Sequence, residues 1–213
     1  MKHLFTDYQK SLLLRFLSDF NTSFPQETLE KLYSYSDMVL NANQGTNLIS
    51  KNDASKFLSR HITDSLMPFI VLKNNSITFS NKSWADMGSG AGCPVIPLSI
   101  VLPEVSFYAV EPRTKRVAFL QEVKRTLNLQ NLKVIGKRFE TSELYNLDFI
   151  SCRALSSFEN DWERAKNKLK PTGLFITLKS LESITHLKNI KITEYQLPEE
   201  PQHYAIVMKG IYD

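Results

Sequence analysis

From Trp84 onward, short apolar runs alternate with helix-like stretches, and this alternation limits the possible fold more than any other feature of the chain. It is typical of an α/β fold with a largely parallel sheet. The polar segment 198–203 is too short for a crossover helix, so the last two strands should form an antiparallel hairpin. Seven strands are expected, at 84–87, 105–110, 132–135, 148–152, 174–178, 190–197 and 204–208, with helices at 92–102, 113–127, 158–168 and 180–188.

The first part of the chain has a helical pattern instead. Apolar residues recur at helical spacing in three stripes, which predict three helices. Breaks are expected where Asn, Ser, Pro and Gly favour caps and turns, and a polar loop follows at 73–83. The sequence therefore predicts an N-terminal helical cap, residues 1–72, and a sheet domain, residues 83–213, in one compact unit. The three stripes lie at 5–20, 29–40 and 57–69, with breaks at 21–25 and 41–47.

Composition sets wider bounds on the protein. Its 213 residues are 42% hydrophobic and can supply one core, and the net charge of +4 is mildly basic. Residues 1–50 carry four Lys/Arg against five Asp/Glu, and the rest carries 22 against 17, a balance compatible with an anionic partner. Cys93 and Cys152 match no zinc or CxxC spacing. The polar N-terminus and short apolar runs predict neither signal peptide nor membrane span, so we expect a reduced, cytoplasmic chain without metal.

Three alternating glycines follow the first expected strand, in the stretch WADMGSGAGCP. A phosphate-binding P-loop would need a Gly-Lys-Ser/Thr ending, and a dinucleotide site would have glycine in place of Cys93. The pattern GxGxG, with Asp86 just before it, is instead that of S-adenosylmethionine sites, whose ligand has an ammonium group that an acid attracts. We therefore expect Asp86, Gly88, Gly90 and Gly92 to line a cofactor site. The alternative is a tight turn without a ligand.

An acid also ends the second expected strand. Glu111 follows VSFYAV, 25 residues after Asp86. A carboxylate in this position can accept hydrogen bonds from both hydroxyls of a ribose. The alternative is an ordinary acid on the protein surface, but its position and spacing together favour the cofactor site.

Further motifs occur in a consistent order along nearly the whole chain. Together with the stretch from Trp84 to Val123 they resemble the small-subunit (16S) rRNA guanine-N7 methyltransferase family, RsmG, also called GidB. This ordered set is far more specific than GxGxG alone. The motifs are NLIS (47–50), RHITDSL (60–66), TKRVAFL (114–120), KRFE (137–140), DFISCRA (148–154) and LKPTG with LKS (169–180).

The resemblance implies a Rossmann-like class I methyltransferase fold, S-adenosylmethionine as cofactor, and roles for particular residues. Gly88 and the backbone around Cys93 would line the cofactor, and Glu111 would hold its ribose. Phe139 and Glu140 would flank the adenine. Arg153, at the end of the fourth strand, would lie over the cofactor where the target base enters. The chain departs from the family pattern at Cys93, at Glu111-Pro112, where Asp-Ser is usual, and at Thr172 and Ser180, which replace glycines.

The groups that are missing also bear on the chemistry. Methylation of cytosine C5 needs a cysteine nucleophile, and Cys152 is near the right position, although a small buried strand residue is the more favoured interpretation. Exocyclic amines commonly need an Asn/Asp-Pro-Pro-aromatic motif, where this chain has SCRAL. Guanine N7 is already a lone-pair acceptor, so its methylation needs positioning and no general base. The site is consistent with N7, without excluding every other acceptor.

Basic residues cluster around the expected site. Arg153 and Lys179 end the fourth and fifth strands, and we predict both to be catalytic. Lys115 and Arg116 are candidates for phosphate contacts or for an ordinary helix surface. Arg60 and His61 are candidates for RNA binding, although His61 lies in an apolar stripe and fits a core or interface role equally, with Asp64 to hold it. The lysines at 166, 168 and 170 are expected to form a solvated helix end.

The sequence thus predicts an enzyme that methylates N7 of a guanine in 16S rRNA within the small ribosomal subunit. It is expected to be a monomer without membrane or metal partners. One alternative is a methyltransferase of the same fold acting on a small molecule or protein. A second is a non-catalytic ribosome-associated RNA-binding module with a degenerate cofactor loop.

Overall fold

The computed structural model describes residues 4–46, 48–187 and 190–211. Parts of some expected segments lie outside these ranges. They are residues 1–3 of the expected cap, residue 47 of the NLIS motif and of the expected break at 41–47, residue 188 of the expected helix 180–188, and residues 188–189 and 212–213 of the expected sheet domain.

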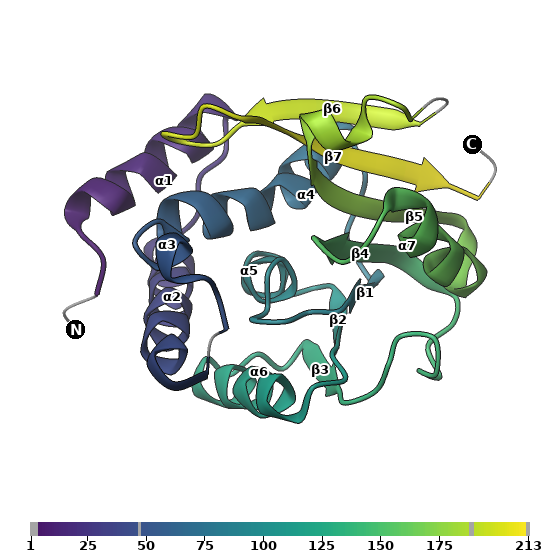
Figure 1. Cartoon of the computed structure of the whole chain (residues 1–213), viewed down its shortest axis with the longest axis horizontal. Helices are drawn as coiled ribbons and strands as arrows, with labels where there is room; N and C mark the ends of the chain where they lie inside the picture. The colour runs from purple at the N-terminus through teal and green to yellow at the C-terminus, as the bar shows by residue number, and fades with distance from the viewer. Residues whose placement is uncertain (1–3, 47, 188–189, 212–213) are drawn as a thin grey trace.

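A seven-stranded sheet forms the centre of the described chain (Figure 1). Its strand order is β3-β2-β1-β4-β5-β7-β6, and the first five strands of that order run parallel. β7 runs antiparallel to both of its neighbours, so β6 and β7 form the expected hairpin. The predicted sheet is confirmed. The strands are β1 Ser83–Met87, β2 Ser106–Val110, β3 Leu132–Ile135, β4 Leu147–Arg153, β5 Leu169–Ser180, β6 Lys191–Gln196 and β7 His203–Gly210.

Alternation along β4 decides which residues meet on each face of the sheet. Phe149 packs in the core shared with the N-terminal helices, whereas Ile150 and Cys152 pack in the core on the opposite face. Because side chains in a strand alternate, Ser151 and Arg153 share the face of Phe149. Arg153 therefore emerges from the end of β4 toward the N-terminal helices.

Three α-helices connect parallel strands. They begin and end close to the expected positions, as α5 Val95–Val101, α6 Thr114–Thr126 and α7 Phe158–Ala165. The last turn of the expected third helix is instead a 3₁₀ turn, η2 Lys166–Lys168. The helix expected at 180–188 is wrong: β5 extends to Ser180, and only a short 3₁₀ turn follows, η3 Leu181–Ile184.

The N-terminal part is helical, as expected. Its elements are α1 Asp7–Asp19, α2 Gln26–Thr46, α3 Lys51–Ala54, the π-helical turn η1 Phe57–Ile62 and α4 Thr63–Asn74. A capping box at Thr6 and Gln9 starts α1. The expected break at 21–25 is present, but α2 continues to residue 46 through most of the expected break at 41–47. Packing of the long apolar stripe of α2 outweighs the poor helix propensity of Asn and Gly.

The N-terminal helices share a hydrophobic core with one face of the sheet. Buried residues from α1, α2 and α4 join Trp84 of β1, Phe107 of β2 and the α5 side chains in one cluster. A second cluster on the opposite face contains Phe158 of α7 and Phe175 of β5. Figure 1 shows α2, α5 and α6 on one side of the sheet and α7 on the other. Within the described ranges, no helix has both the length and the apolar character needed to cross a membrane.

Candidate functional site

The glycine loop turns sharply where β1 ends. Gly88, Gly90 and Gly92 all have left-handed backbone angles, with φ of +74°, +58° and +106°. The amides of Gly88 and Ser89 both donate to the carbonyl of Val110, at 2.9 and 3.1 Å. The loop is thereby bound to the end of the neighbouring strand β2.

The three glycines have different surroundings. A Cβ on Gly90 would meet only the tip of Arg116 at 3.7 Å and the carbonyl oxygen of Gly88 at 3.8 Å, so a side chain there would make ordinary van der Waals contacts without a clash. A Cβ on Gly88 would lie 2.9 Å from the flexible side chain of Leu155. A Cβ on Gly92 would lie 2.5 Å from Ile96 and 3.0 Å from the hydroxyl of Tyr35. Gly88 thus borders a cavity. A side chain could be accommodated at Gly90, whereas Gly92 is packed against protein.

Asp86 lies beneath this loop and is only 1% exposed. It pairs with Ser151 in the register of β1 and β4, and the hydroxyl of Ser151 donates to its Oδ1 at 2.7 Å. Its buried Oδ2 has no hydrogen-bond partner among the described residues. Burial raises the pKa of Asp86 to about 6. An unsatisfied buried carboxylate oxygen is costly, and a cationic ligand group would relieve that cost.

Glu111 directly follows β2, beside the loop, and is 2% exposed. Its Oε2 accepts from the amide of Gly90 at 2.9 Å, and its Oε1 accepts from the amide of Arg113 at 2.9 Å. The guanidinium of Arg116 lies 3.8 Å from Oε2. Glu111 is therefore a buried acid that fixes the glycine loop, and not the solvated surface acid of the alternative interpretation. A carboxylate has about four lone-pair sites, so two remain for a ligand.

A cavity opens between the glycine loop and the long connection from β3 to β4. Phe139 in that connection is 3% exposed and lines the cavity together with Gly88 and Leu155. Glu140 lies at its rim, where its carboxylate pairs with Arg164 of α7 at 3.1 Å. The apolar part of the lining, formed by Met87, Val110, Phe139 and Leu155, suits a flat aromatic group.

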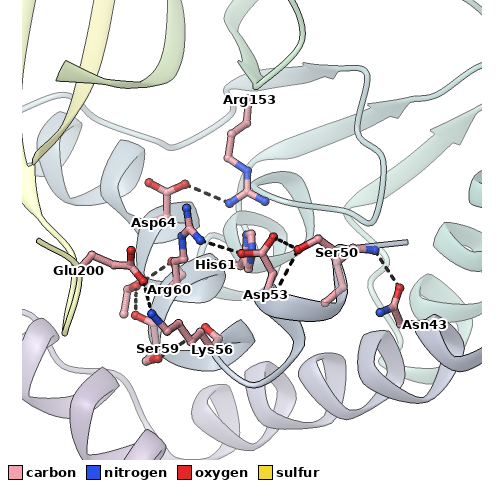
Figure 2. A network of polar contacts seen from close by, with 12 residues as sticks. Asn43, Ser50, Asp53, Lys56, Ser59, Arg60, His61, Asp64, Arg153 and Glu200 are labelled. Carbon is pink, nitrogen blue, oxygen red and sulfur yellow. Dashed lines mark hydrogen bonds and ion pairs between the residues drawn. The ribbon is translucent and has the colours of Figure 1, made fainter. Parts of the chain in front are cut away.

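Arg153 lies beside a second cavity, between β4 and the N-terminal helices. Its side chain is 19% exposed, and its Nη1 lies 3.0 Å from Oδ2 of Asp64 in α4. The other oxygen of Asp64 accepts a short hydrogen bond from the hydroxyl of Tyr195 in β6. Figure 2 shows Arg153 reaching from β4 toward Asp64 and His61.

His61 and Arg60 lie in the π-helical turn η1 and border the same cavity. π-Helical turns often occur at functional sites, where they redirect side chains. Arg60 pairs with Asp53 at 2.7 Å (Figure 2). Both ring nitrogens of His61 are buried without a hydrogen-bond partner in the described chain, although Nε2 lies 3.5 Å from Oδ1 of Asp53. Burial and the nearby Arg153 lower the pKa of His61 to about 3, so its ring is neutral.

Lys179 follows a different course from Arg153. By alternation along β5 it shares the face of Phe175, opposite to the face of Arg153. Its ammonium donates to the carbonyl of Ser156 and lies 3.4 Å from the fully buried Asp161 of α7. Asp161 also accepts from the hydroxyl of Ser156, at 2.5 Å. Lys179 thus stabilises the loop that follows β4 through Ser156, and it also borders the cavity beside Arg153.

Cys152 points into the core on the face opposite to Arg153. It is 0% exposed, and its sulfur contacts Thr177 at 3.4 Å and Asp161 at 3.5 Å. Burial and the neighbouring carboxylate raise the pKa of the thiol. These surroundings are those of an inert core cysteine. Across the described ranges, no group of three or more His, Cys, Asp or Glu side chains is placed to hold a metal ion.

Other candidate residues surround the glycine loop. Cys93 is buried, and its sulfur lies 3.4 Å from the hydroxyl of Tyr35 in α2. That hydroxyl also donates to the carbonyl of Ala91 in the loop, at 2.9 Å. Lys115 is exposed on the first turn of α6, and Arg116 beside it is half-buried near Glu111.

Comparisons with known proteins show the family of this chain. The family described as rRNA small subunit methyltransferase G, GidB, matches residues 28–210. A Ribosomal RNA small subunit methyltransferase G of Helicobacter pylori is 40% identical over 149 residues, which cover 70% of this chain and 80% of the relative. The chain belongs to the rRNA small subunit methyltransferase G family. The family resemblance predicted from the sequence motifs is confirmed.

Other members of the family match over similar lengths. The Aliarcobacter butzleri protein is 35% identical over 153 residues, covering 71% of this chain and 75% of that protein. The Mycoplasma mobile protein is 34% identical over 172 residues, covering 78% of this chain and 76% of that protein. Both carry the name Ribosomal RNA small subunit methyltransferase G.

Solved structures share the fold at low sequence identity. The METTL16 methyltransferase domain has a TM-score of 0.57 at 16% identity, covering 85% of this chain and 81% of that chain. Precorrin-6y C5,15-methyltransferase from Geobacter metallireducens has a TM-score of 0.54 at 14% identity, covering 78% and 92%. The predicted class I methyltransferase fold is confirmed.

The structure places seven of the fourteen predicted residues of this family member around two cavities, and it adds residues that the motifs did not indicate. One cavity has Gly88, Phe139 and Glu140, and the other has Arg60, His61, Arg153 and Lys179. Tyr35 lies three residues after Leu32 and four before Val39, so its spacing already placed it on the apolar face of α2. No local pattern indicated Tyr195 or Asp161. Tyr195 contacts Asp64 across 131 residues of sequence, and Asp161 contacts Lys179 across 18.

Proposed function

We propose that this chain transfers a methyl group from S-adenosylmethionine to N7 of a guanine in 16S rRNA of the small ribosomal subunit. The observation that carries the proposal is a buried acid with an unpartnered oxygen beneath an intact glycine loop, in a member of the rRNA small subunit methyltransferase G family. S-Adenosylmethionine supplies a methyl group already activated on a sulfonium. The protein's own residues have to bind, orient and shield the two reactants.

The residues present fit this cofactor. Asp86 offers its free Oδ2 to the ammonium group, and Gly88 and Gly90 leave room for close approach. Glu111 keeps lone pairs for the ribose hydroxyls while it fixes the loop. The adenine then belongs in the apolar cavity lined by Phe139, with Glu140 at its rim. Gly92 and Cys93 contribute through the shape of the loop, because both pack against protein.

The second cavity is suited to the guanine. Arg153 borders it, is positively charged and is held by Asp64, so it can orient an acceptor-rich base edge. His61 is neutral, and its ring nitrogens make no hydrogen bond among the described residues beyond the 3.5 Å contact with Asp53, which favours a contact with the base over a purely structural role. Because N7 has no proton to lose, none of these residues has to act as a general base.

The remaining basic residues receive distinct roles. We assign Arg60, Lys115 and Arg116 to contacts with RNA. Arg60 borders the base cavity, Arg116 lies 3.8 Å from Glu111, and Lys115 is exposed beside Arg116 on α6. For Lys179, the contacts with Ser156 and Asp161 favour positioning of the loop after β4 over contact with the reacting atoms.

We also propose that residues 1–72 act as a cap on the domain formed by residues 83–213, in a single cytoplasmic monomer. The shared hydrophobic core and the bond from Tyr35 to the glycine loop support one compact unit. In this arrangement the cap supplies one wall of the guanine cavity.

Two binding measurements test the proposal against its rivals. Calorimetry should show uptake of S-adenosylmethionine by the wild type, strong loss in Asp86→Asn and little change in the exposed control Glu104→Gln. Affinity for small subunits should fall steeply between 50 and 200 mM salt, because phosphate contacts release counterions. A methyltransferase of small molecules or proteins would bind the cofactor without salt-sensitive rRNA affinity. A non-catalytic RNA-binding module would bind rRNA without taking up the cofactor.

A further inference from the structure

Lys168 differs from its two neighbours in the lysine run. The sequence predicts a solvated helix end here, and Lys166 does pair with Glu163 at the surface. Lys170 instead pairs with the buried Asp148, at 2.7 Å. Lys168 is only 5% exposed, and burial lowers the pKa of its ammonium. A buried lysine is rare and costly unless its charge is well solvated by protein groups.

The ammonium of Lys168 is solvated by one segment, the connection from β3 to β4. Its Nζ donates to the carbonyl of Ser142 at 2.7 Å and to that of Leu144 at 3.3 Å. The same nitrogen lies over the rings of Tyr145, at 4.4 Å, and Phe139, at 5.5 Å, within the range of cation–π attraction. One side chain thus contacts four residues of this connection.

The connection needs such a support because residues 136–146 form neither helix nor strand. Its internal bonds are local turns, such as the one from the amide of Ser142 to the carbonyl of Phe139 at 3.1 Å. The connection also contains the wall of the cofactor cavity, formed by Phe139 and Glu140. Glu140 is tied at the rim by Arg164, where the pair is partly exposed. Lys168 is the buried residue that holds this connection by hydrogen bonds.

We propose that Lys168 is a positioning residue for the adenine end of the cofactor site. Its ammonium fixes the backbone of residues 142–144 and the ring of Phe139, and thereby holds the wall of the cavity in shape before the cofactor arrives. The proposal rests on the proposed function, since it takes the cavity beside Gly88 as the adenine site. Lys168 does not touch the cofactor or the methyl acceptor.

The test compares Lys168→Met with two variants from the same run. Lys166→Met removes a lysine that pairs at the surface, and Lys170→Met removes one of the two lysines that pair with Asp148, neither of which lines the cavity. We expect Lys168→Met to raise the Kd and the KM for S-adenosylmethionine at least tenfold. It should leave kcat at saturating cofactor, and the KM for small subunits, within about twofold of wild type. Lys166→Met should match wild type, and Lys170→Met should lower stability without changing cofactor affinity.

Tyr145→Leu provides a variant that avoids the buried charge, because the tyrosine is 63% exposed. It removes one ring from the ammonium and should raise the Kd for S-adenosylmethionine about threefold in a folded protein. Unchanged cofactor affinity in Lys168→Met, or in Tyr145→Leu if the first variant does not fold, overturns the proposal. So does a matching loss of affinity in Lys170→Met, which would reflect stability alone. Absence of cofactor uptake by the wild type would overturn the proposed function and this role together.

Discussion

The guanidinium of Arg153 lies 3.0 Å from the carboxylate of Asp64 and joins the end of β4 to the helix α4 of the N-terminal part. The second oxygen of Asp64 accepts from Tyr195 in β6. Three segments that are far apart in the sequence therefore converge on one carboxylate. The pair holds Arg153 at the boundary between sheet and cap, next to the neutral ring of His61.

Removing Asp64 should destabilise the protein strongly. Asp64→Ala leaves a largely buried guanidinium without its counterion, and breaking a buried pair on one side costs about 3–5 kcal/mol. Urea denaturation measures this loss as a lower midpoint at unchanged slope. The double variant Asp64→Ala with Arg153→Met removes the unpaired charge and should recover part of the stability. Additive losses in the double variant would show that the two side chains are not coupled.

Cofactor binding should depend on pH through Asp86. The pKa of Asp86 in the free protein is raised to about 6. Ionisation of Asp86 therefore destabilises the free protein: the protein is more stable below about pH 4, and this extra stability is lost as the pH rises through 6. A bound ammonium favours the ionised form, and binding below pH 6 then releases a proton. The Kd for S-adenosylmethionine should therefore rise about tenfold from pH 7 to pH 5. Calorimetry in buffers of different ionisation enthalpy checks both effects, and Asp86→Asn should show neither.

Substitutions at two glycines of the loop should affect different properties of the protein, cofactor affinity at Gly90 and stability at Gly92. A Cβ on Gly90 would clash with nothing, and its φ of +58° is a conformation that Asp tolerates, so Gly90→Asp should cost about 1 kcal/mol of stability and lower cofactor affinity at least tenfold. Gly92→Ala places a methyl group 2.5 Å from Ile96 and should destabilise the fold by about 1–3 kcal/mol. Thermal unfolding and calorimetry separate the two effects. Normal cofactor binding by Gly90→Asp would contradict the position of the site.

The hydrogen bond from Tyr35 to Ala91 should couple the N-terminal cap to the conformation of the glycine loop. Tyr35→Phe removes the hydroxyl that satisfies the carbonyl of Ala91 and should cost about 1 kcal/mol of stability. Because that carbonyl belongs to the glycine loop, the Kd for S-adenosylmethionine should also rise a few fold. Tyr8→Phe is a matched control, since its hydroxyl meets Glu199 at the surface. Equal cofactor affinity in both variants would separate the cap from cofactor binding.

Local pattern was sufficient to predict most of the fold. The strands and their final hairpin follow from apolar runs and from the short polar segment 198–203, which leaves no room for a crossover. In place of the expected helix at 180–188 there is only the short 3₁₀ turn η3, and Ser180 belongs to β5 through its pairing with β7, which is a long-range contact. The same limitation explains the continuation of α2, where tertiary packing outweighs residue propensity.

The candidate site was predictable where it depends on position along a strand. Asp86 and Glu111 end neighbouring parallel strands, so their proximity follows from the topology alone. The partners of Arg153 and Lys179 were not predictable, because Asp64 and Asp161 meet them through packing of separate helices. Lys168 illustrates the same limit: three lysines at alternate positions have three different environments, and only the fold distinguishes them.

The most direct test of the function uses S-adenosylmethionine with a labelled methyl group and purified small subunits from a bacterium that lacks the N7 modification. The rRNA is digested after the reaction, and the labelled nucleosides are identified by mass spectrometry. We predict labelled 7-methylguanosine from one fragment of 16S rRNA, and none with the Asp86→Asn variant. Label on a different nucleoside, or none at all from a wild type that binds the cofactor, would contradict the proposed reaction.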